Sequence, residues 1–161
     1  MLKIQPLTGR HDRNRLQSGS GDLDRWLRET AQQHRKRGIS RTFVAVDDAD
    51  PTHVLGYYAL TACEVLTQEL PDELRKRLPR KVPGIRLGRL AVDETVQGRG
   101  LGELLLMDAI QRARHVLEHV GVHALFVDAK DARAAAFYRK YGFRSLPDQP
   151  LQLVLGLAGL E

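Results

Sequence analysis

Six residues between positions 97 and 102 have the types and spacing expected of a loop that binds phosphate. The run is Gln97-Gly98-Arg99-Gly100-Leu101-Gly102, and an amphipathic helical pattern follows it. Glycines let the backbone turn sharply and approach a ligand closely. The first amides of a helix have no internal acceptor, and the helix dipole adds partial positive charge there. We therefore predict that this loop binds a diphosphate, with Arg99 adding a full positive charge.

Two better-known nucleotide loops and a plain structural turn are the alternatives. Gly98, Gly100 and Gly102 are spaced by two throughout, which differs from the dinucleotide fingerprint Gly-x-Gly-x-x-Gly. A nucleotide-hydrolysing P-loop requires Gly-Lys-Ser/Thr, which is absent from this run. The sequence therefore fits neither nucleotide pattern.

Tyr138 is the second residue that could do chemistry. Ala134, Phe137, Tyr138 and Tyr141 recur at helical spacing, which by itself predicts a core-facing stripe. On these residues alone, packing is the more ordinary role for Tyr138.

Two motifs in this order resemble those of the GNAT acetyltransferase superfamily. Gln-x-x-Gly-x-Gly at 97–102 is similar to its acetyl-CoA loop, and the run from Asp131 through Tyr138 to Phe143 resembles its closing motif. The family usually has Asn where Asp131 stands, so a side-chain contact from this position to the pantetheine arm departs from the pattern. From about residue 18 to 155 the chain more closely resembles the GNAT toxins of toxin–antitoxin pairs, the TacT-like and AtaT-like proteins. The stretches that carry this resemblance are 20–27, 40–44, 56–60, 87–93, 127–129 and 136–138.

This resemblance implies an acetyl-CoA-dependent N-acetyltransferase that acetylates the α-amino group of aminoacyl-tRNA and blocks translation. It also implies a ribbon-helix-helix antitoxin as partner and a homodimer, with no metal and no membrane. It implies that the Tyr138 hydroxyl protonates or hydrogen-bonds the leaving thiolate, and that one backbone N–H near Leu90 to Val92 polarises the thioester carbonyl. The cofactor-binding residues that it implies are Leu90, Ala91, Val92, Gln97, Gly98, Arg99, Gly100, Leu101, Gly102 and Asp131.

Basic side chains gather in two segments, 25–41 and 72–89, of a chain whose net charge is +5. Such clustering favours a polyanionic partner, although two solvated faces are the alternative. Phosphate contacts would give affinity and positioning without reading sequence. The residues expected to contact tRNA are Arg35, Lys36, Arg37, Arg75, Lys76, Arg77, Arg80, Lys81, Arg86 and Arg89. Arg89 could instead orient the acceptor end or stabilise the fold.

No strong general base is expected. A free α-amino group has a pKa of about 7.7–8.0, against about 10.4 for lysine, so much of it is neutral at cytoplasmic pH. Asp93 and Glu94 are weak candidates for a base. His115, His119 and His123 are expected at the surface or at helix ends, because no carboxylate or cysteine cluster at ligand spacing is apparent beside them.

Two other functions remain open. The acceptor could be a protein N-terminus, a lysine or a small amine instead of aminoacyl-tRNA. The chain could also bind acyl-CoA or nucleic acid as a non-catalytic regulator. An intact loop together with Tyr138 favours catalysis, because a degenerate binder need not keep both.

The periodicity predicts an α/β domain with a mixed sheet. The resemblance adds the GNAT fold, in which a mostly antiparallel sheet splays at the cofactor site and helices flank it. We expect a β-bulge near Gly88-Arg89, where the apolar alternation slips. The expected strands are 3–7, 42–46, 54–65, 85–92, 122–127 and 151–155, and the expected helices are 22–37, 72–78, 101–119 and 132–141, with caps at Asp22, Gly38, Asp131 and Gly142.

The length of 161 residues fits one domain, 1–161. No apolar run reaches the roughly 20 residues of a membrane helix, and the N-terminus lacks the apolar stretch of a signal peptide. The single cysteine, Cys63, cannot form an internal disulfide. These features favour a cytoplasmic protein.

Overall fold

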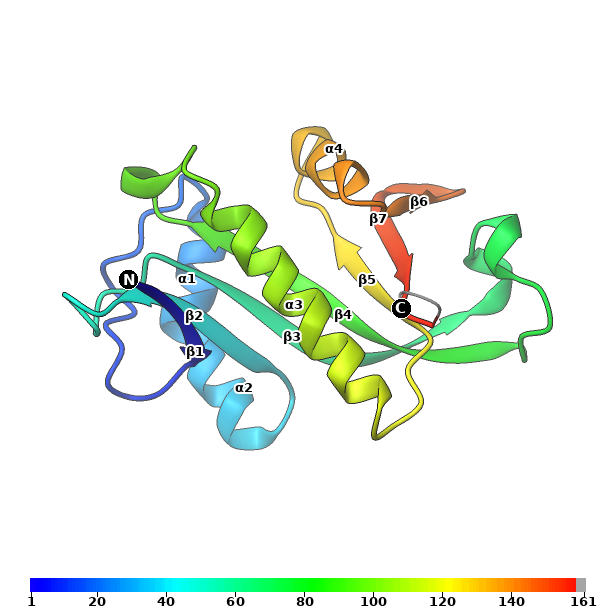
Figure 1. Cartoon of the computed structure of the whole chain (residues 1–161), viewed down its shortest axis with the longest axis horizontal. Helices are drawn as coiled ribbons and strands as arrows, with labels where there is room; N and C mark the ends of the chain where they lie inside the picture. Colours follow the sequence, from blue (N-terminus) through cyan, green and yellow to red (C-terminus); the bar gives the residue numbers. More distant parts are fainter. Residues whose placement is uncertain (159–161) are drawn as a thin grey trace. The chain divides into compact units, whose positions relative to one another are not determined.

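The computed structural model describes residues 1–158, in which seven strands and four α-helices follow one another in a β-α-α-β-β-β-α-β-α-β-β order (Figure 1). Three short 3-10 turns, Thr67–Glu69, Asp72–Leu74 and Glu94–Val96, interrupt the connections. The elements are β1 Leu2–Pro6, α1 Gly21–Glu29, α2 Ala31–Arg37, β2 Arg41–Asp47, β3 Gly56–Leu66, β4 Lys81–Val92, α3 Leu101–Leu117, β5 Ala124–Asp128, α4 Ala132–Lys140, β6 Arg144–Leu146 and β7 Gln149–Gly156.

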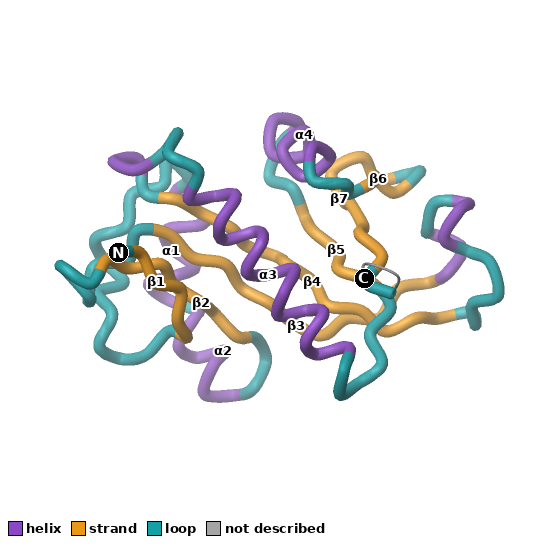
Figure 2. The backbone as a smooth tube through the Cα atoms, in the orientation of Figure 1, coloured by secondary structure: helices purple, strands orange, loops and turns teal. Residues whose placement is uncertain are grey.

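The strands form one sheet in the order β1-β2-β3-β4-β5-β7-β6 (Figure 2). β1 with β2, β2 with β3, β5 with β7 and β6 with β7 are antiparallel, and β4 with β5 is parallel. The mixed, mostly antiparallel sheet is therefore confirmed. The register of β4 with β5 runs only from Gly84 to Leu87, whereas β4 continues to Val92.

The chain divides into two compact units, each with its own apolar core. One unit comprises Met1–Thr61 with Arg89–Ala109, and the other comprises Ala62–Gly88 with the chain from Ile110 onward. The first core includes Leu7, Leu27, Val44, Val54 and Tyr57. The second core includes Val65, Leu70, Val82, Phe126 and Val154.

Gly56 lets three elements of the first unit approach one another closely. A Cβ at this position would lie 2.9 Å from the Ala91 carbonyl oxygen and 3.0 Å from Cδ1 of Leu105. Real Cβ atoms are rarely that close to backbone atoms, so a side chain at Gly56 would displace β4 or α3. Because α3 begins at Leu101, within the predicted phosphate loop, this close packing of β3 also positions the loop.

The helix predicted over 22–37 is wrong in one respect, because it is two helices. Thr30 has φ −116° and separates α1 from α2, although its amide still donates to the Trp26 carbonyl. The N-cap is Ser20 and not Asp22, since the Ser20 hydroxyl accepts from the Leu23 amide. The predicted C-cap Gly38 is confirmed, with φ 69°.

The basic helix predicted over 72–78 is wrong. Only the 3-10 turn Asp72–Leu74 forms there, and Arg77 adopts a positive φ of 61°. A helix nucleus is costly, and a segment this short between prolines cannot recover that cost by propagation. The guanidinium of Arg75 instead donates to the Leu70 carbonyl at 2.6 Å and holds the segment as a turn.

Two further details differ from the sequence expectation. Helical spacing predicts that Val116 belongs to the core-facing stripe of the 101–119 helix, but Val116 is 37% exposed and Leu106 is buried instead. The short strand β6 was missed. It pairs with β7 antiparallel through Arg144 and Ser145, with a register irregularity before Leu146.

Candidate active site

The predicted phosphate loop has the backbone conformation that an anion-binding loop needs. Gly98 and Gly100 have φ angles of 78° and 83°, a left-handed region that L side chains rarely adopt. The Leu104 amide donates to the Gly100 carbonyl at 3.1 Å and begins α3. Among the described residues, none accepts a hydrogen bond from the amides of Gly98 through Gly102. A run of amides without protein partners at a helix start is suited to bind a diphosphate.

Gln97 braces this loop against the end of β4. Its side-chain amide donates to the Val92 carbonyl and to the Ser18 carbonyl, each at 2.9 Å. The predicted cofactor residues Leu90, Ala91 and Val92 lie in the same unit as the loop. The Gln97 hydrogen bond links the loop to the last of them, Val92. The Gln97 side chain has a bracing role that the motif alone did not reveal, whereas Arg99 is exposed and forms no ion pair with any described residue.

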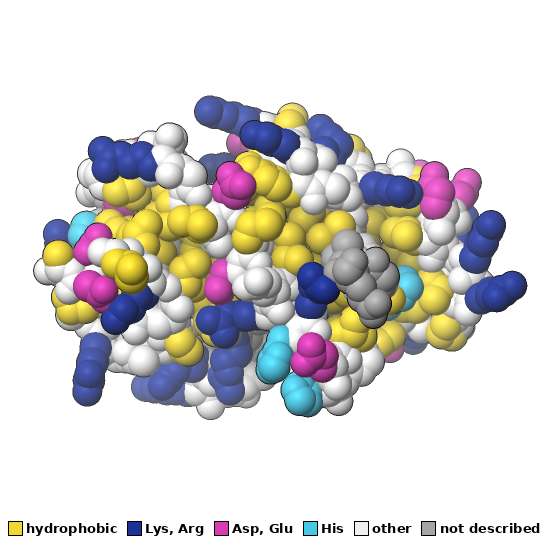
Figure 3. Space-filling model, in the orientation of Figure 1, with side chains coloured by type: hydrophobic (Ala, Val, Ile, Leu, Met, Phe, Trp, Pro, Cys, Tyr) yellow, Lys and Arg dark blue, Asp and Glu magenta, His cyan; other side chains and the backbone are white. Residues whose placement is uncertain are grey.

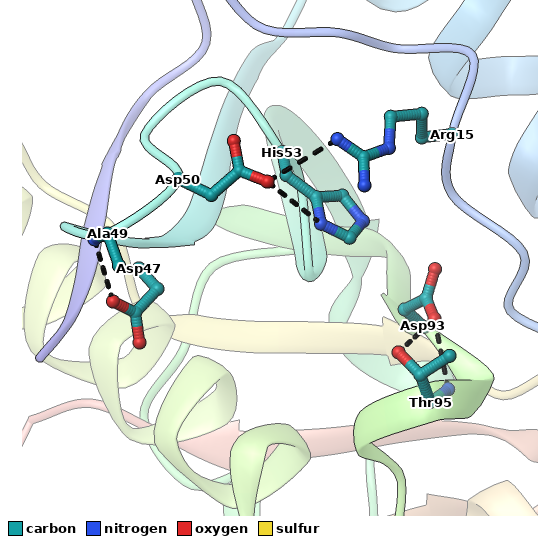
Figure 4. A network of polar contacts seen from close by, with 7 residues as sticks. All are labelled: Arg15, Asp47, Ala49, Asp50, His53, Asp93 and Thr95. Carbon is teal, nitrogen blue, oxygen red and sulfur yellow. Dashed lines mark hydrogen bonds and ion pairs between the residues drawn. The ribbon is translucent and has the colours of Figure 1, made fainter.

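Asp93 closes β4 as a structural carboxylate. It is only 3% exposed, and its Oδ1 accepts hydrogen bonds from the Thr95 hydroxyl at 2.7 Å and the Thr95 amide at 3.0 Å (Figure 4). Its Oδ2 accepts a third hydrogen bond from the Gln17 amide at 3.1 Å. Burial opposes ionisation, but these bonds and the nearby His53 outweigh it and lower the pKa of Asp93. An acid whose pKa is lowered and whose oxygens are engaged is a poor general base. Asp93 is therefore disfavoured as a general base by this structure.

Tyr138 belongs to the second unit, on α4. Its ring packs edge-on against Phe137 and Phe143, and the residue is 5% exposed, so the core-stripe interpretation holds for the ring. Its hydroxyl makes no hydrogen bond to any described residue. Burial, followed by the charge of Asp128, raises the pKa of Tyr138 well above its usual range. The hydroxyl therefore stays protonated and able to donate.

Arg86 and Asp128 form a half-buried ion pair in the same unit. Nη1 of Arg86 lies 2.9 Å from Oδ1 of Asp128, and the guanidinium lies 5.8 Å from the centre of the Phe126 ring. Cys63 lies beside this pair, and burial raises the pKa of its thiol. Arg86 is therefore engaged inside the protein, although the sequence suggested a tRNA contact.

Asp131 performs the capping role expected of it. Its Oδ1 accepts from the Ala134 amide at 2.8 Å, and α4 starts at the next residue. Since capping occupies this oxygen, the family contact normally made by Asn would have to come from the other oxygen or the backbone.

The basic residues divide into engaged and exposed groups. Arg75 contacts Asp72, and Lys81 lies 3.5 Å from Glu64. Arg35 is half-buried at the end of α2. The exposed members with no ion pair to any described residue are Lys36, Arg37, Lys76, Arg77 and Arg80.

An aromatic and cationic cluster in the first unit was not foreseen. Trp26 stacks on Tyr57 with ring centroids 6.0 Å apart, and the Arg89 guanidinium lies 5.4 Å from the centre of the Trp26 ring. Tyr57 and Tyr58 are fully buried, and their hydroxyls donate to the Leu23 carbonyl and to Asp108. Packing is thus their evident role. Arg89 is thus held in a defined position in β4, directly before the Leu90–Val92 backbone that is predicted to polarise the thioester carbonyl.

The expectation that the histidines lack a companion carboxylate is wrong for two of them. Ligand atoms of His115, Glu118 and His119 all lie within 4.8 Å of one another at the end of α3. The i, i+3 and i+4 spacing of these residues could have revealed the cluster. His123 is not part of it.

The mixed sheet and the amide-rich loop at the start of α3 are features expected of an acyl-CoA-dependent transferase. The family model described as Acetyltransferase (GNAT) domain matches residues 38–145, and the chain belongs to that family. Two curated relatives cover most of its length. A tRNA-acetylating toxin of Mycobacterium tuberculosis is 41% identical over 138 residues, which are 86% of this chain and 81% of the relative. A probable toxin TacT of Sinorhizobium fredii is 30% identical over 98% of this chain and 92% of its own.

Solved structures of related toxins have the same fold. A tyrosine-to-phenylalanine mutant of KacT has a TM-score of 0.91 at 28% identity, covering 97% of this chain and 95% of that one. AtaT complexed with acetyl-methionyl-tRNAfMet has a TM-score of 0.90 at 29% identity, with the same coverage. AtaTR bound with AcCoA has a TM-score of 0.85 at 30% identity, covering 97% and 94%. Within residues 1–158, no helix of this protein is long and apolar enough to cross a membrane.

Proposed function

We propose that this protein transfers the acetyl group of acetyl-CoA to the α-amino group of aminoacyl-tRNA and thereby blocks translation. The observation that carries the proposal is the run of available amides from Gly98 to Gly102, which includes the two left-handed glycines Gly98 and Gly100. The 41% identity to a tRNA-acetylating toxin supports the choice of acceptor, as does the likeness to AtaT, which has been solved with acetyl-methionyl-tRNAfMet.

The loop amides and the exposed Arg99 would hold the pyrophosphate of the coenzyme. The backbone of Leu90 to Val92 would bind the pantetheine arm, and one of its N–H groups would polarise the thioester carbonyl. Losing one such oxyanion donor costs about 3 kcal/mol in other enzymes. The fit of loop to ligand is supported by φ at Gly98 and Gly100, since β-carbons there would oppose the required turn.

The neutral α-amine attacks the acetyl carbonyl, so that a C–N bond forms and the C–S bond breaks. Tyr138 gives its proton to the departing sulfur, and the amine loses a proton to water, which restores the tyrosine. The Tyr138 hydroxyl has no competing acceptor among the described residues, and its raised pKa keeps the proton in place until sulfur develops charge. No strong base is required, because an aminoacyl ester amine is substantially neutral near pH 7.

The exposed cations would supply the electrostatic part of tRNA binding. Lys36 and Arg37 end α2 in the first unit, and Lys76, Arg77 and Arg80 lie in the connection between β3 and β4 in the second. Arg89, held over Trp26, is better suited to orient the acceptor end than to bind a distant phosphate. This assignment refines the set of ten basic residues expected from the sequence.

The test is acetyl transfer from labelled acetyl-CoA to total charged tRNA, with mass spectrometry of the acetylated aminoacyl ends. Peptide N-termini, lysine peptides and polyamines serve as rival acceptors in parallel reactions. Tyr138→Phe should lower kcat by about 100-fold, the lower end of general-acid effects, while coenzyme binding persists. Tyr141→Phe, at the residue that caps the C-terminal end of the same helix, is the matched control. Transfer to peptides but not to tRNA would refute the acceptor, and coenzyme binding without any transfer would favour a non-catalytic regulator.

Partner and assembly proposals accompany this function. An antitoxin partner is proposed because an AtaT mutant has been solved with the C-terminus of its antitoxin AtaR. The family resemblance of the sequence adds that this antitoxin is of the ribbon-helix-helix class. A homodimer and a cytoplasmic location follow from the family resemblance and from where charged tRNA is found. The whole chain is proposed to act as one domain, because β3, β4 and α3 each contribute residues to both units. Sedimentation analysis of the protein alone and with a co-expressed antitoxin tests the assembly.

A further inference from the structure

Three side chains outside the proposed active site converge at the C-terminal end of α3. His115, Glu118 and His119 are all exposed, and one ligand atom from each lies within 4.8 Å of the others. Nδ1 of His115 is 3.5 Å from Oε2 of Glu118, and the two imidazole rings lie 5.1 Å apart at 71°. Figure 3 shows histidine side chains gathered beside an acidic one on the face in view.

The backbone keeps these side chains on one side as the helix ends. The Glu118 amide donates to the His115 carbonyl at 3.1 Å, and the His119 amide donates to the Val116 carbonyl at 2.9 Å. This tightened turn continues the helical path for two residues past Leu117. The i, i+3 and i+4 side chains therefore remain neighbours.

The spacing suits a small divalent cation. Imidazole nitrogens and carboxylate oxygens bind Zn²⁺ at about 2.0–2.2 Å, so two ligands at a tetrahedral angle lie about 3.3 Å apart. The His115–Glu118 separation of 3.5 Å is already close to that value. His119 needs only a rotation of an exposed side chain to complete three ligands, and water can complete the coordination.

The end of the helix also favours a cation. The last carbonyls of a helix have no intrahelical donors and carry partial negative charge. Glu118 adds a full negative charge, and its exposed fraction of 69% leaves room for bound water beside the ion. Imidazole with one carboxylate is a donor set that selects borderline metals such as zinc, copper or nickel over magnesium and calcium.

We propose that His115, Glu118 and His119 form a binding site for one zinc-like divalent cation at the end of α3, separate from the acetyl-transfer chemistry. The ion bridges the last turn of the helix and the two residues that follow it. Because it binds the folded chain, it stabilises that end of α3.

The experiment is calorimetric titration of untagged protein with Zn²⁺, since a histidine tag would add sites of its own. We expect one ion per chain. His115→Ala and His119→Ala should each weaken binding at least tenfold, because even partners outside the ligand shell change affinity by about 10–100-fold. His123→Ala is the matched control, since this residue lies in the same unit but outside the cluster. Circular dichroism checks that each variant is folded.

A second measurement separates a site from loose adsorption. Zn²⁺ should raise the thermal midpoint of the wild type and of His123→Ala, and leave that of the His115→Ala/His119→Ala double variant unchanged. Equal zinc affinity in the double variant, or one ion per two chains, would overturn the proposed chelate. Acetyl transfer should proceed at the same rate with and without EDTA, and a loss of activity in EDTA would overturn the separation from catalysis.

Discussion

Arg86 of β4 donates a hydrogen bond to Asp128 at the end of β5, with 2.9 Å between Nη1 and Oδ1. Asp128 also acts on the catalytic candidate. Burial is the larger cause of the raised pKa of Tyr138, and the charge of Asp128 is the second cause. The guanidinium is thus part of the environment of the proposed proton donor.

Arg86→Ala should lower kcat by about tenfold, a fraction of the 100- to 10,000-fold effect of a whole general acid. Without the cation, the Asp128 charge is less compensated, and donation by Tyr138 to the departing sulfur becomes harder. The KM for tRNA and its salt dependence should stay unchanged. Steady-state kinetics at several salt concentrations measure both. A change in KM alone would indicate that Arg86 contacts tRNA and does not act through Asp128.

The double variant Lys76→Ala/Arg77→Ala should weaken tRNA binding and lower the slope of log K against log salt by about 1.5, since each phosphate contact contributes about 0.7–0.9. Lys3→Ala/Arg10→Ala removes the same charge from residues outside the predicted set and serves as control. Filter binding across a salt series gives both slopes. Equal slopes in the two variants would mean that net charge, not this segment, governs binding.

Gly100→Ala should raise the dissociation constant of acetyl-CoA at least tenfold. Its φ of 83° costs an L residue about 1–2 kcal/mol, and relaxation of the loop would turn the amides away from the diphosphate. Gly121→Ala is the control, because that glycine has open space and no positive φ. Calorimetry with the coenzyme measures the difference. Unchanged binding in Gly100→Ala would show that the loop amides do not hold the ligand.

Asp93→Ala should lower the free energy of unfolding by about 2 kcal/mol near neutral pH, because hydrogen bonds to a charged group are lost and donors are left buried. The folded pKa of Asp93 is lowered from its ordinary 3.8, so its charge stabilises the fold above that value. This stabilisation disappears as pH falls through the folded pKa. Urea unfolding of the wild type and of Asp93→Ala should therefore give a difference in unfolding free energy, called the gap here, that narrows below about pH 4. A gap independent of pH would contradict a role for the charge.

Acetyl transfer should reach a plateau as the acceptor amine loses its proton, with no alkaline decline up to about pH 10, the ordinary pKa of tyrosine. Burial and then the charge of Asp128 raise the pKa of Tyr138 above that value, so its proton is retained. A tRNA analogue with an amide-linked amino acid avoids ester hydrolysis in alkali. A decline with an apparent pKa below 10 that disappears in Tyr138→Phe would contradict this assignment.

Features that depend on adjacent residues were predictable from the sequence. The loop from Gln97 to Gly102, the cap at Asp131 and the left-handed Gly38 each follow from local backbone chemistry, and each forms as expected. Contacts between distant residues carry no such signal. Arg86 and Asp128 are 42 positions apart, and Tyr58 and Asp108 are 50 apart, so only the folded sheet and α3 reveal these pairs.

The predicted start of the first helix was wrong because two residues were equally suitable as its N-cap. Ser20 and Asp22 both make good N-caps, and the structure uses Ser20, whose hydroxyl accepts from the Leu23 amide at 3.4 Å. The 72–78 segment has the composition of a helix but too few residues to propagate one. The cluster of His115, Glu118 and His119 was not predicted, because Glu118 lies beside His115 only at the i, i+3 spacing of a helix.

The environment of Cys63 has a practical use in labelling. It is the only cysteine of the chain, and burial raises the pKa of its thiol, which reduces the reactive thiolate at neutral pH. The native thiol should therefore react slowly with maleimides, and a cysteine introduced at exposed Gln33 should react first. A single fluorophore could then follow tRNA or antitoxin binding without replacing any natural residue.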